Sequence, residues 1–254
     1  MHRMGGESSK KKSGFEERFY RAWAAGKELS SFEVVIAETD LQVFADRPLE
    51  RETDAAVRRL RRDIEMYAAM HDGFIESLTP LEPAPDAPEV VRRMCEAAAY
   101  YGVGPMASVA GAIAEYAGQV LLEHSRQVII ENGGDIFFHT NEPPLFGLYA
   151  GKSSPFTGRV KFRPSGITRG GMCTSSGTVG HSISFGRADA AAVLASNALL
   201  ADAAATAICN SVRTAKNVQE AIEVEQARGL VDGLVIAIGN TLGVWGKVEI
   251  IEGA

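Results

Sequence analysis

Alternation of hydrophobic and polar residues is clear from residue 32 onward. Phe32–Asp46 has two halves rich in β-branched and aromatic residues on either side of Glu38-Thr39-Asp40, which predicts a β-hairpin. Arg51–His71 instead carries apolar residues at helical spacing opposite a face of arginines, which predicts a long amphipathic helix. The apolar positions of this helix are Ala55, Val57, Leu60, Ile64, Tyr67 and Ala68.

Proline and glycine then divide the chain. Leu81–Pro88 is rich in proline and predicts a connecting segment, and Glu89–Tyr101 returns to a helical pattern. Gly102-Val103-Gly104-Pro105 breaks that helix, and Pro105 suits the first position of the next one, Met106–His124. This next helix is rich in Ala, Gly and Ser, which allows close packing against a helix, a sheet or a ligand.

The second half of the chain mixes strands and helices. Gln127–Thr140 reads as strand, turn and strand, because Asn132-Gly133-Gly134 can supply the positive φ angles that a tight hairpin turn needs. Further strands are predicted at Leu145–Ala150, Gly158–Phe162, Met172–Thr174, His181–Phe185, Ala190–Ala195, Gly233–Gly239 and Gly243–Ile251, with helices at Asn197–Asn210 and Asn217–Arg228. This order predicts an α+β fold of antiparallel sheets with packed helices.

Composition and length favour one globular domain. The chain has 254 residues, of which 46% are hydrophobic and 23% charged. We expect a disordered basic tail over residues 1–14, aromatic residues at helix-like offsets over Phe15–Trp23, and a single domain over residues 15–254. The formal net charge of −6 argues against nucleic acid or an anionic membrane as the main partner.

Cysteine usage and hydropathy indicate the cellular compartment in which the protein works. The three cysteines, Cys95, Cys173 and Cys209, are odd in number and form no CxxC motif, which indicates a reducing compartment. No run approaches the roughly 18 apolar residues of a membrane-spanning helix, and the basic start is not followed by the apolar run of a secretory signal. We therefore expect a cytoplasmic protein.

Candidate chemistry is concentrated in Gly170–Asn210. The stretch begins with glycines and hydroxyls and ends in an alanine-rich helix that carries Asp202 and Thr206. Their spacing of four residues places a carboxylate and a hydroxyl on one helix face, and such oxygens suit Mg²⁺. A glycine-rich loop beside a magnesium site is what a nucleotide-like ligand needs.

Plainer interpretations remain open at this point. Glycine and hydroxyl clusters often form ordinary loops, and Asp202 and Thr206 can instead cap their helix or bond back to its backbone. The Asn132–Asp135 turn can present a carboxylate or be a simple hairpin tip. Two common motifs are excluded, because Gly180 is followed by His181 rather than the lysine of a P-loop, and Ser175 and Ser176 lack the flanking glycines of a nucleophile elbow.

Four stretches together resemble one superfamily in chain order. They are VGPMASVAGAIAE (Val103–Glu115), ENGGDIF (Glu131–Phe137), CTSSGTVGHSIS (Cys173–Ser184) and LLADAAATAI (Leu199–Ile208). The chain resembles the ApbE family of FAD:protein FMN transferases, which has a T-fold-related α+β fold. More narrowly, it is similar to a short ApbE-like branch of anaerobic bacteria and methanogens, which ETDL (Glu38–Leu41) also resembles.

This resemblance implies a magnesium and flavin site. By resemblance, Asp202 and Thr206 would bind Mg²⁺ with the backbone carbonyl of Ala107, and His181 would assist transfer as a general base. The flavin nucleotide, FAD in the transferases, would lie near Asn132, Gly133, Gly134, Asp135, Thr174, Ser175, Ser176 and Gly177.

Several departures separate this chain from the transferases. Gly104-Pro105 stands where they have Lys-Gly, and neither Ser108 nor Val109 matches their aspartate at the start of the small-residue helix. The hairpin before His181 is cut to Thr178-Val179-Gly180, and Ser184-Phe185 replaces their Asp-Pro. The secretion signal and lipobox of the lipoprotein form are also missing. The resemblance thus supports the metal site more fully than the transfer chemistry.

Three functions follow as hypotheses. The first is a Mg²⁺-dependent flavin or nucleotide site with FMN transfer to a protein acceptor. The second, by resemblance to the short branch, is a non-catalytic accessory role in anaerobic sulfur assimilation, with a partner from homocysteine formation. The third is a flavin-binding protein without transferase activity. All three leave a homodimer possible, and fold alone does not decide among them.

Overall fold

A large antiparallel sheet forms the centre of the protein. The computed structural model describes residues 29–177 and 186–252, and within them this sheet has the strand order β1-β2-β3-β4-β7-β8-β9-β10. Its strands are β1 (Ser30–Ile36), β2 (Thr39–Ala45), β3 (Val128–Asn132), β4 (Asp135–His139), β7 (Arg169–Ser175), β8 (Ala190–Ala195), β9 (Gly233–Ile238) and β10 (Thr241–Gly246). A smaller sheet, in the order β11-β6-β5, contains β5 (Phe146–Gly147), β6 (Val160–Pro164) and β11 (Val248–Glu252).

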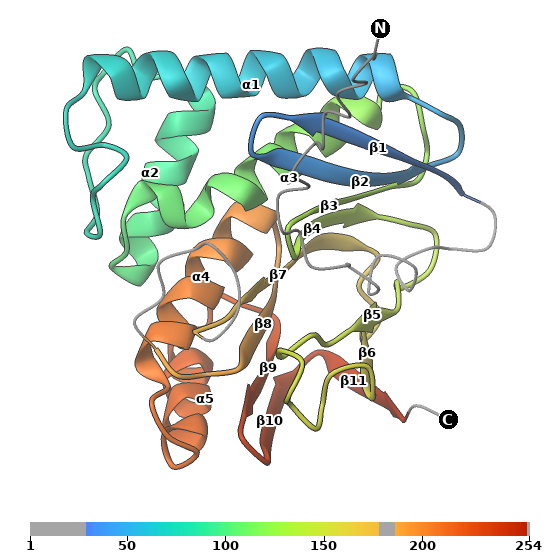
Figure 1. The fold of residues 1–254 in the computed structure, drawn as a ribbon, viewed down its shortest axis with the longest axis vertical. Helices are drawn as coiled ribbons and strands as arrows, with labels where there is room; N and C mark the ends of the chain where they lie inside the picture. The colour runs from blue at the N-terminus through green and yellow to red at the C-terminus, as the bar shows by residue number, and fades with distance from the viewer. Residues whose placement is uncertain (1–28, 178–185, 253–254) are drawn as a thin grey trace, which may run out of the picture.

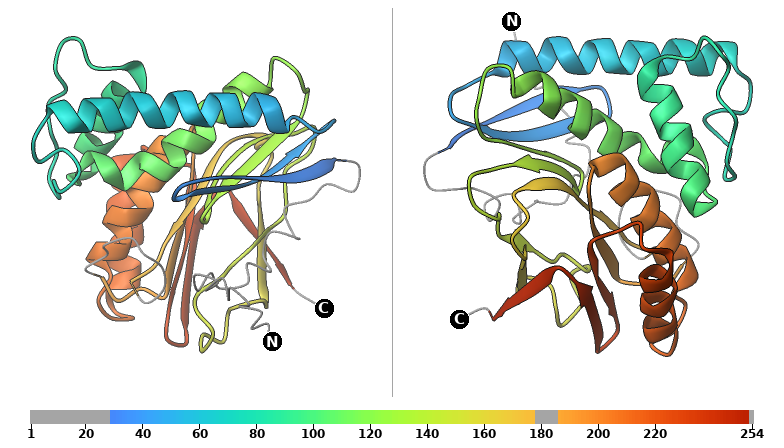
Figure 2. Two further views of the ribbon diagram at one scale, coloured as in Figure 1. Left: turned by 45° about the horizontal axis from the view of Figure 1, so that its top comes forward. Right: turned by 180° about the vertical axis from the view of Figure 1, so that it is seen from behind.

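Helices cover one face of the large sheet, and the small sheet lies against the other (Figures 1 and 2). The helices are α1 (Glu50–Met70), α2 (Glu89–Tyr101), α3 (Val109–Leu121), α4 (Ala198–Ser211) and α5 (Asn217–Arg228), and a short 3₁₀ helix, η2 (Pro105–Ser108), precedes α3. Figure 1 shows α1 lying along one edge of the molecule, with α4 packed along β7 and β8. No helix in the described ranges is both long enough and apolar enough to cross a bilayer.

Alternate residues of a strand point to opposite sides of the sheet, and the central strands β3, β4, β7, β8 and β9 bury both of their faces. Phe137 and Val193 belong to the core under the helices, whereas their neighbours Phe138 and Leu194 belong to the core under the small sheet. All four side chains are almost completely buried. The sheet therefore holds two hydrophobic cores apart, and the helix-side core is where the candidate site lies.

The predicted fold class is confirmed, as are most of the predicted elements. Helix α2, strand β8 and helix α5 have the predicted bounds, and both predicted hairpins, β1–β2 and β3–β4, form antiparallel pairs. The helix predicted from Met106 begins instead as the 3₁₀ turn η2 and becomes α-helical at Val109. The tail 1–14, the aromatic segment Phe15–Trp23 and the strand His181–Phe185 lie outside the described residues.

The last predicted strand is two strands in two different sheets. Gly246 has φ 83° and separates β10, which pairs with β9, from β11, which pairs with β6. The chain passes so close to its neighbour here that a Cβ on Gly246 would lie 2.3 Å from the carbonyl oxygen of Asp232. Lys247 N–H also donates to that oxygen, at 2.8 Å. The prediction of one continuous strand over Gly243–Ile251 was therefore wrong.

Candidate functional site

Asp202 lies where α4 crosses the beginning of α3. Its side chain is 8% exposed, and its Oδ2 accepts a hydrogen bond of 2.9 Å from the backbone N–H of Gly111. Ser108, the residue before α3, makes no side-chain capping bond, so the carboxylate of Asp202 takes that role from another helix. The proposed ligand residue is thus also the cap of α3.

The turn between β3 and β4 is tied to the same helix end. Gly133 and Gly134 have φ angles of 70° and 110°, which confirms the positive φ predicted for this turn. The carboxylate of Glu131 accepts the N–H of Gly134 at 2.7 Å and so closes the turn. Asn132 reaches out of the turn, and its Nδ2 donates to the carbonyl of Ala110 at 3.1 Å.

Strand β7 brings the hydroxyl segment beside this turn. Asp135 of β4 lies opposite Cys173 of β7, and its carboxylate receives hydrogen bonds from the thiol of Cys173 and the backbone of Thr174. The Sγ of Cys173 also lies 3.3 Å from the carbonyl oxygen of Ala198, in the first turn of α4. The turn, β7 and the first turn of α4 therefore meet at one place. Of the predicted β7 residues, Thr174 contributes its backbone there, because its side chain alternates with that of Cys173 and points toward the small sheet.

Two carboxyl groups with raised pKa values face each other there. Burial and then the charge of Asp135 raise the pKa of Asp202 well above its usual range, although the amides of Gly111 and Ala110 act in the opposite direction. Burial also raises the pKa of Asp135, to about 7, with a further contribution from the charge of Glu131. No Lys or Arg of the described residues lowers either pKa. Asp202 is buried and Asp135 half-buried, and two carboxyl groups so close together favour a bound cation or a bound proton.

Ser175 supplies an unsatisfied polar group on the same side of the sheet. It is two residues beyond Cys173 on β7, so both side chains point toward the helices. Ser175 is 6% exposed, and its hydroxyl is buried without a hydrogen-bond partner among residues 29–177 and 186–252. Buried polar groups are usually paired, and this one is available to a ligand.

The predicted ligands, Asp202, Thr206 and Ala107, offer oxygen atoms, which suit Mg²⁺ rather than a metal bound by nitrogen and sulfur. Within the described ranges, no group of three or more His, Cys, Asp or Glu side chains is placed to hold a metal ion. Thr206 lies one turn after Asp202 on α4, and Ala107 lies in η2, which packs against α4; both are half-buried. One carboxylate, one hydroxyl, one backbone carbonyl and several waters or phosphate oxygens make a suitable magnesium shell.

Other predicted residues have a plainer placement. Thr174, Ser176 and Gly177 are half-buried at the end of β7, beside the turn that carries Gly134. His181 lies outside the described residues, so its predicted proximity to Asp202 stays a prediction.

A comparison with family models identifies the chain. A model described as AbpE bacteria matches residues 21–241. The chain belongs to this family. Its relatives include UPF0280 protein MK0206 of Methanopyrus kandleri, which is 40% identical over 223 residues covering 85% of this chain and 90% of the relative. UPF0280 protein MJ1526 of Methanocaldococcus jannaschii is 39% identical over 222 residues, with the same two shares.

Solved structures share the fold of this AbpE bacteria family member. The flavin transferase ApbE from Vibrio cholerae superposes with a TM-score of 0.57 at 9% identity, covering 87% of this chain and 97% of that one. The Pseudomonas stutzeri flavinyl transferase ApbE in its apo form gives 0.57 at 11% identity, with coverage of 86% and 94%. At these identities the likeness establishes the fold, and the resemblance to ApbE proteins is confirmed at that level.

Sequence reasoning missed three residues of the site. Glu131 closes the turn, Gly111 lets α4 approach α3, and Glu115 caps α4 by accepting the N–H of Ala198 at 2.8 Å. A signal for Glu115 was present, since it is the one charged residue in the sequence of α3. When a helix is otherwise apolar and buried, a single charged side chain on it needs a hydrogen-bond or ion-pair partner, because burying an unpaired charge is costly.

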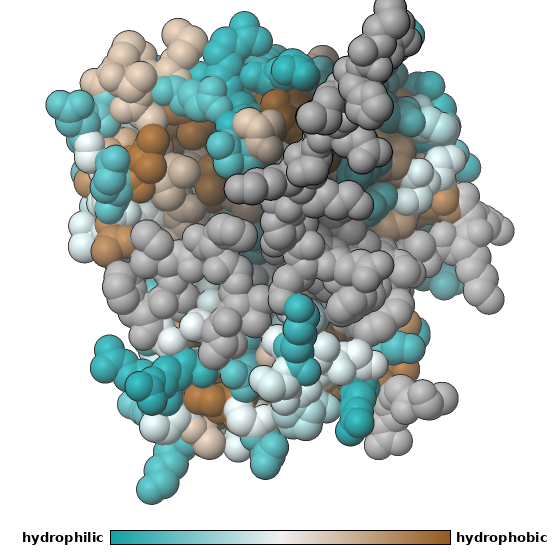
Figure 3. Space-filling view, in the orientation of Figure 1, coloured by the Kyte–Doolittle hydropathy of each residue, from teal (hydrophilic) through white to brown (hydrophobic). Residues whose placement is uncertain are grey.

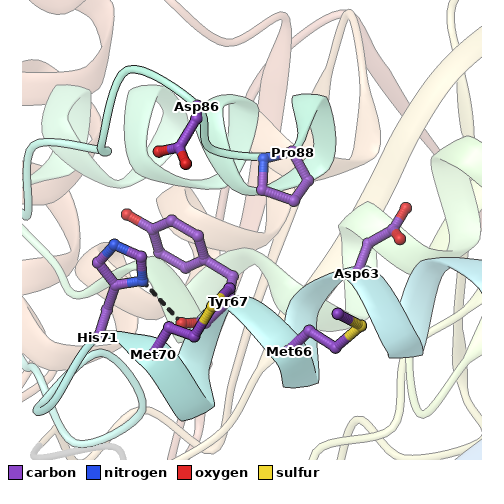
Figure 4. A pocket seen from close by; sticks show the side chains of 7 residues that line it. All are labelled: Asp63, Met66, Tyr67, Met70, His71, Asp86 and Pro88. Carbon is purple, nitrogen blue, oxygen red and sulfur yellow. Dashed lines mark hydrogen bonds between the residues drawn. The ribbon is translucent and has the colours of Figure 1, made fainter.

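A cavity of about 150 Å³ lies elsewhere, around the end of α1 (Figure 4). It is lined by Asp63, Met66, Tyr67, Met70, His71, Asp86 and Pro88. In Figure 3, hydrophobic side chains are visible in the quarter of the surface where α1 ends and α2 begins. A second cavity, of about 50 Å³, lies between α2 and the first turn of α4. Neither is lined by any predicted site residue, so neither supports the candidate chemistry.

Proposed function

We propose that this AbpE bacteria family member binds a flavin nucleotide together with Mg²⁺ and acts as a flavin transferase. The observation that carries the proposal is the pair of carboxyl groups of Asp135 and Asp202. No Lys or Arg of the described residues lowers either pKa, and the Ser175 hydroxyl on the same side of the sheet has no hydrogen-bond partner among those residues. The solved proteins with this fold, from Vibrio cholerae and Pseudomonas stutzeri, are described as flavin transferases. That shared description supports the ligand class.

The local electrostatics require a cation if a phosphate group is to bind. A helix N-terminus commonly binds phosphate through its free amides, but Asp202 already occupies the amide of Gly111. A second anion placed against Asp135 and Asp202 would be repelled. Mg²⁺ held by Asp202, Thr206 and the carbonyl of Ala107 would neutralise this charge and the charge of a pyrophosphate.

The protein side chains then have separable tasks. Asp202 holds the metal and caps α3, while the Asn132–Asp135 turn and Thr174–Gly177 border the ligand. In transfer, the hydroxyl oxygen of an acceptor forms a bond to the FMN phosphorus of FAD, the pyrophosphate bond to AMP breaks, and the hydroxyl proton passes to a base. His181 is the predicted base, and a protein hydroxyl in the cytoplasm is the predicted acceptor.

Equilibrium dialysis with FAD tests the proposal. We expect FAD to be retained with MgCl₂, lost with EDTA, and lost in the variant Asp202→Asn with MgCl₂ present. Equal retention with and without EDTA would overturn the metal assignment, and no retention under any condition would overturn the flavin assignment. Release of AMP from bound FAD, followed by chromatography, separates a transferase from a protein that only binds flavin.

A further inference from the structure

Helices α3 and α4 cap each other: a carboxylate from each helix accepts a backbone N–H in the first turn of the other. Gly111 of α3 donates its N–H to Asp202 of α4 at 2.9 Å, and Ala198 of α4 donates its N–H to Glu115 of α3 at 2.8 Å. In each helix the carboxylate lies four residues after the amide that is capped. The two bonds and the two helical turns between them therefore form a closed ring.

The backbones inside this ring are in direct contact. A Cβ on Gly111 would lie 2.3 Å from the carbonyl oxygen of Ala198, and a Cβ on Gly171 of β7 would lie 2.3 Å from the Cα of Ala198. The first turn of α4 is thus enclosed between α3 and β7. With so little space, the position of Asp202 one turn later depends on how Ala198 is held.

Glu115 is the side chain that holds Ala198. It is 5% exposed, and its other carboxylate oxygen, Oε1, accepts a hydrogen bond of 3.0 Å from Gln119 Nε2. Asn197, the cap residue of α4 itself, serves the amide of Leu200 instead, at 2.9 Å. The bond from Ala198 to Glu115 therefore adds a tie that the cap of α4 does not provide.

We infer that Glu115 is a positioning residue for the metal-binding carboxylate of Asp202. It fixes the first turn of α4 against α3, and this contact sets where the carboxylate of Asp202 points. The inference rests on the proposed function for its consequence in metal binding. The structural part of the inference is that Glu115 is coupled to the hydrogen bond between Asp202 and Gly111. This part does not depend on any ligand.

Three variants and a matched control test the coupling. Glu115→Ala removes the acceptor, Glu115→Asp draws it back by one methylene, and Glu115→Gln keeps an oxygen at the same reach. Glu225 provides the control, because it is 3% exposed and accepts a hydrogen bond of 2.9 Å from Tyr101, in a contact between α2 and α5. Glu225→Ala should thus remove a comparable buried tie at a distance from Asp202.

Two measurements are made on each full-length protein. Amide hydrogen exchange at Gly111 reports the bond to Asp202 without any metal, and Mn²⁺ titration followed by electron paramagnetic resonance reports the affinity of the oxygen site. We expect Glu115→Ala and Glu115→Asp to speed exchange at Gly111 and to weaken Mn²⁺ binding by about tenfold or more. We expect the Mn²⁺ affinity of Glu115→Gln to stay within about threefold of that of the parent. We expect Glu225→Ala to change neither measurement, because a residue outside the metal shell affects the metal only through the ligand that it contacts.

The outcomes separate the inference from the proposed function. Unchanged exchange at Gly111 in both Glu115→Ala and Glu115→Asp would overturn the inference, as would an equal loss in Glu225→Ala. If the parent binds no Mn²⁺, the metal site is rejected and exchange at Gly111 still decides the positioning role. If Glu115→Ala does not fold, the positioning role is decided by comparing Glu115→Asp with Glu115→Gln: faster exchange at Gly111 in the Asp variant alone supports the role, and equal exchange in the two variants overturns it.

Discussion

The carboxylate of Asp202 is committed to the beginning of α3. Its Oδ2 accepts the N–H of Gly111, and the amide of Ala110 is a second hydrogen-bond partner, so a metal would share this carboxylate with the helix cap. Spacing in the sequence suggested both a metal ligand and a cap for Asp202, and the structure shows that the capping role is real but serves a different helix. Replacing Asp202 therefore has structural as well as chemical consequences.

Two substitutions at Asp202 separate these consequences. Asp202→Ala should lower the free energy of unfolding by about 0.5–2 kcal/mol, the usual loss for a helix cap. Asp202→Asn keeps an oxygen for the amide of Gly111, so it should retain most of that stability and still lose the stabilisation by MgCl₂. Urea denaturation with and without MgCl₂ measures both effects. A full Mg²⁺ response in Asp202→Asn would contradict the assignment.

Asp135 should make stability depend on pH. Its pKa rises from 3.8 to about 7 on folding, so the folded state binds the proton more tightly than the unfolded state. The stabilisation is then complete below about pH 4 and is lost as the pH rises through about 7. We expect Asp135→Asn to have a flatter profile than the parent over that range and higher stability at pH 8. Denaturation midpoints of the metal-free proteins across this range measure the difference; parallel profiles would contradict it.

At the scale of elements, the approach of α4 to α3 depends on a missing side chain. Gly111→Ala would place a methyl group 2.3 Å from the carbonyl oxygen of Ala198, which is backbone and cannot rotate away. Alanine favours a helix by about 1 kcal/mol over glycine, but the forced separation should outweigh this and cost about 1–3 kcal/mol overall.

Thermal unfolding of Gly111→Ala measures whether the forced separation outweighs the gain in helix propensity. The same protein, unfolded with and without MgCl₂, also tests the metal site. Because α4 must retreat, Asp202 should lose its bond to residue 111 and the protein should respond more weakly to MgCl₂. A variant as stable as the parent would show that α4 moves away from α3 without loss.

Elements with local signals were predictable from the sequence, and their long-range contacts were not. The β3–β4 turn follows from Asn132-Gly133-Gly134, and the bounds of α2 and α5 follow from helical spacing. Transfer of the chain at Gly246 from one sheet to the other depends on contact with Asp232, which no short window of sequence records. Glu115 and Ala198 are likewise 83 residues apart.

At the scale of the whole molecule, the site lies where four distant parts of the chain meet. The beginning of α3, the β3–β4 turn, the end of β7 and the first turns of α4 are linked by Asn132, Asp135 and Asp202. The family resemblance predicted this meeting from separate motifs, although the pattern of each motif alone indicated only a loop or a helix. A ligand that touches all four parts should stabilise them together.

Hydrogen exchange with FAD and MgCl₂ tests this joint stabilisation. At a free ligand concentration 100 times Kd, binding adds about 2.7 kcal/mol to the stability of the folded state. We expect slower exchange at once in residues 105–115, 131–137, 172–177 and 198–208, and no change in Asp202→Asn under the same conditions. The end of α1, around the cavity of Figure 4, should exchange as in the free protein. Protection confined to that cavity, or to one of the four segments, would contradict a shared site, because a ligand that contacts all four segments slows exchange in each of them.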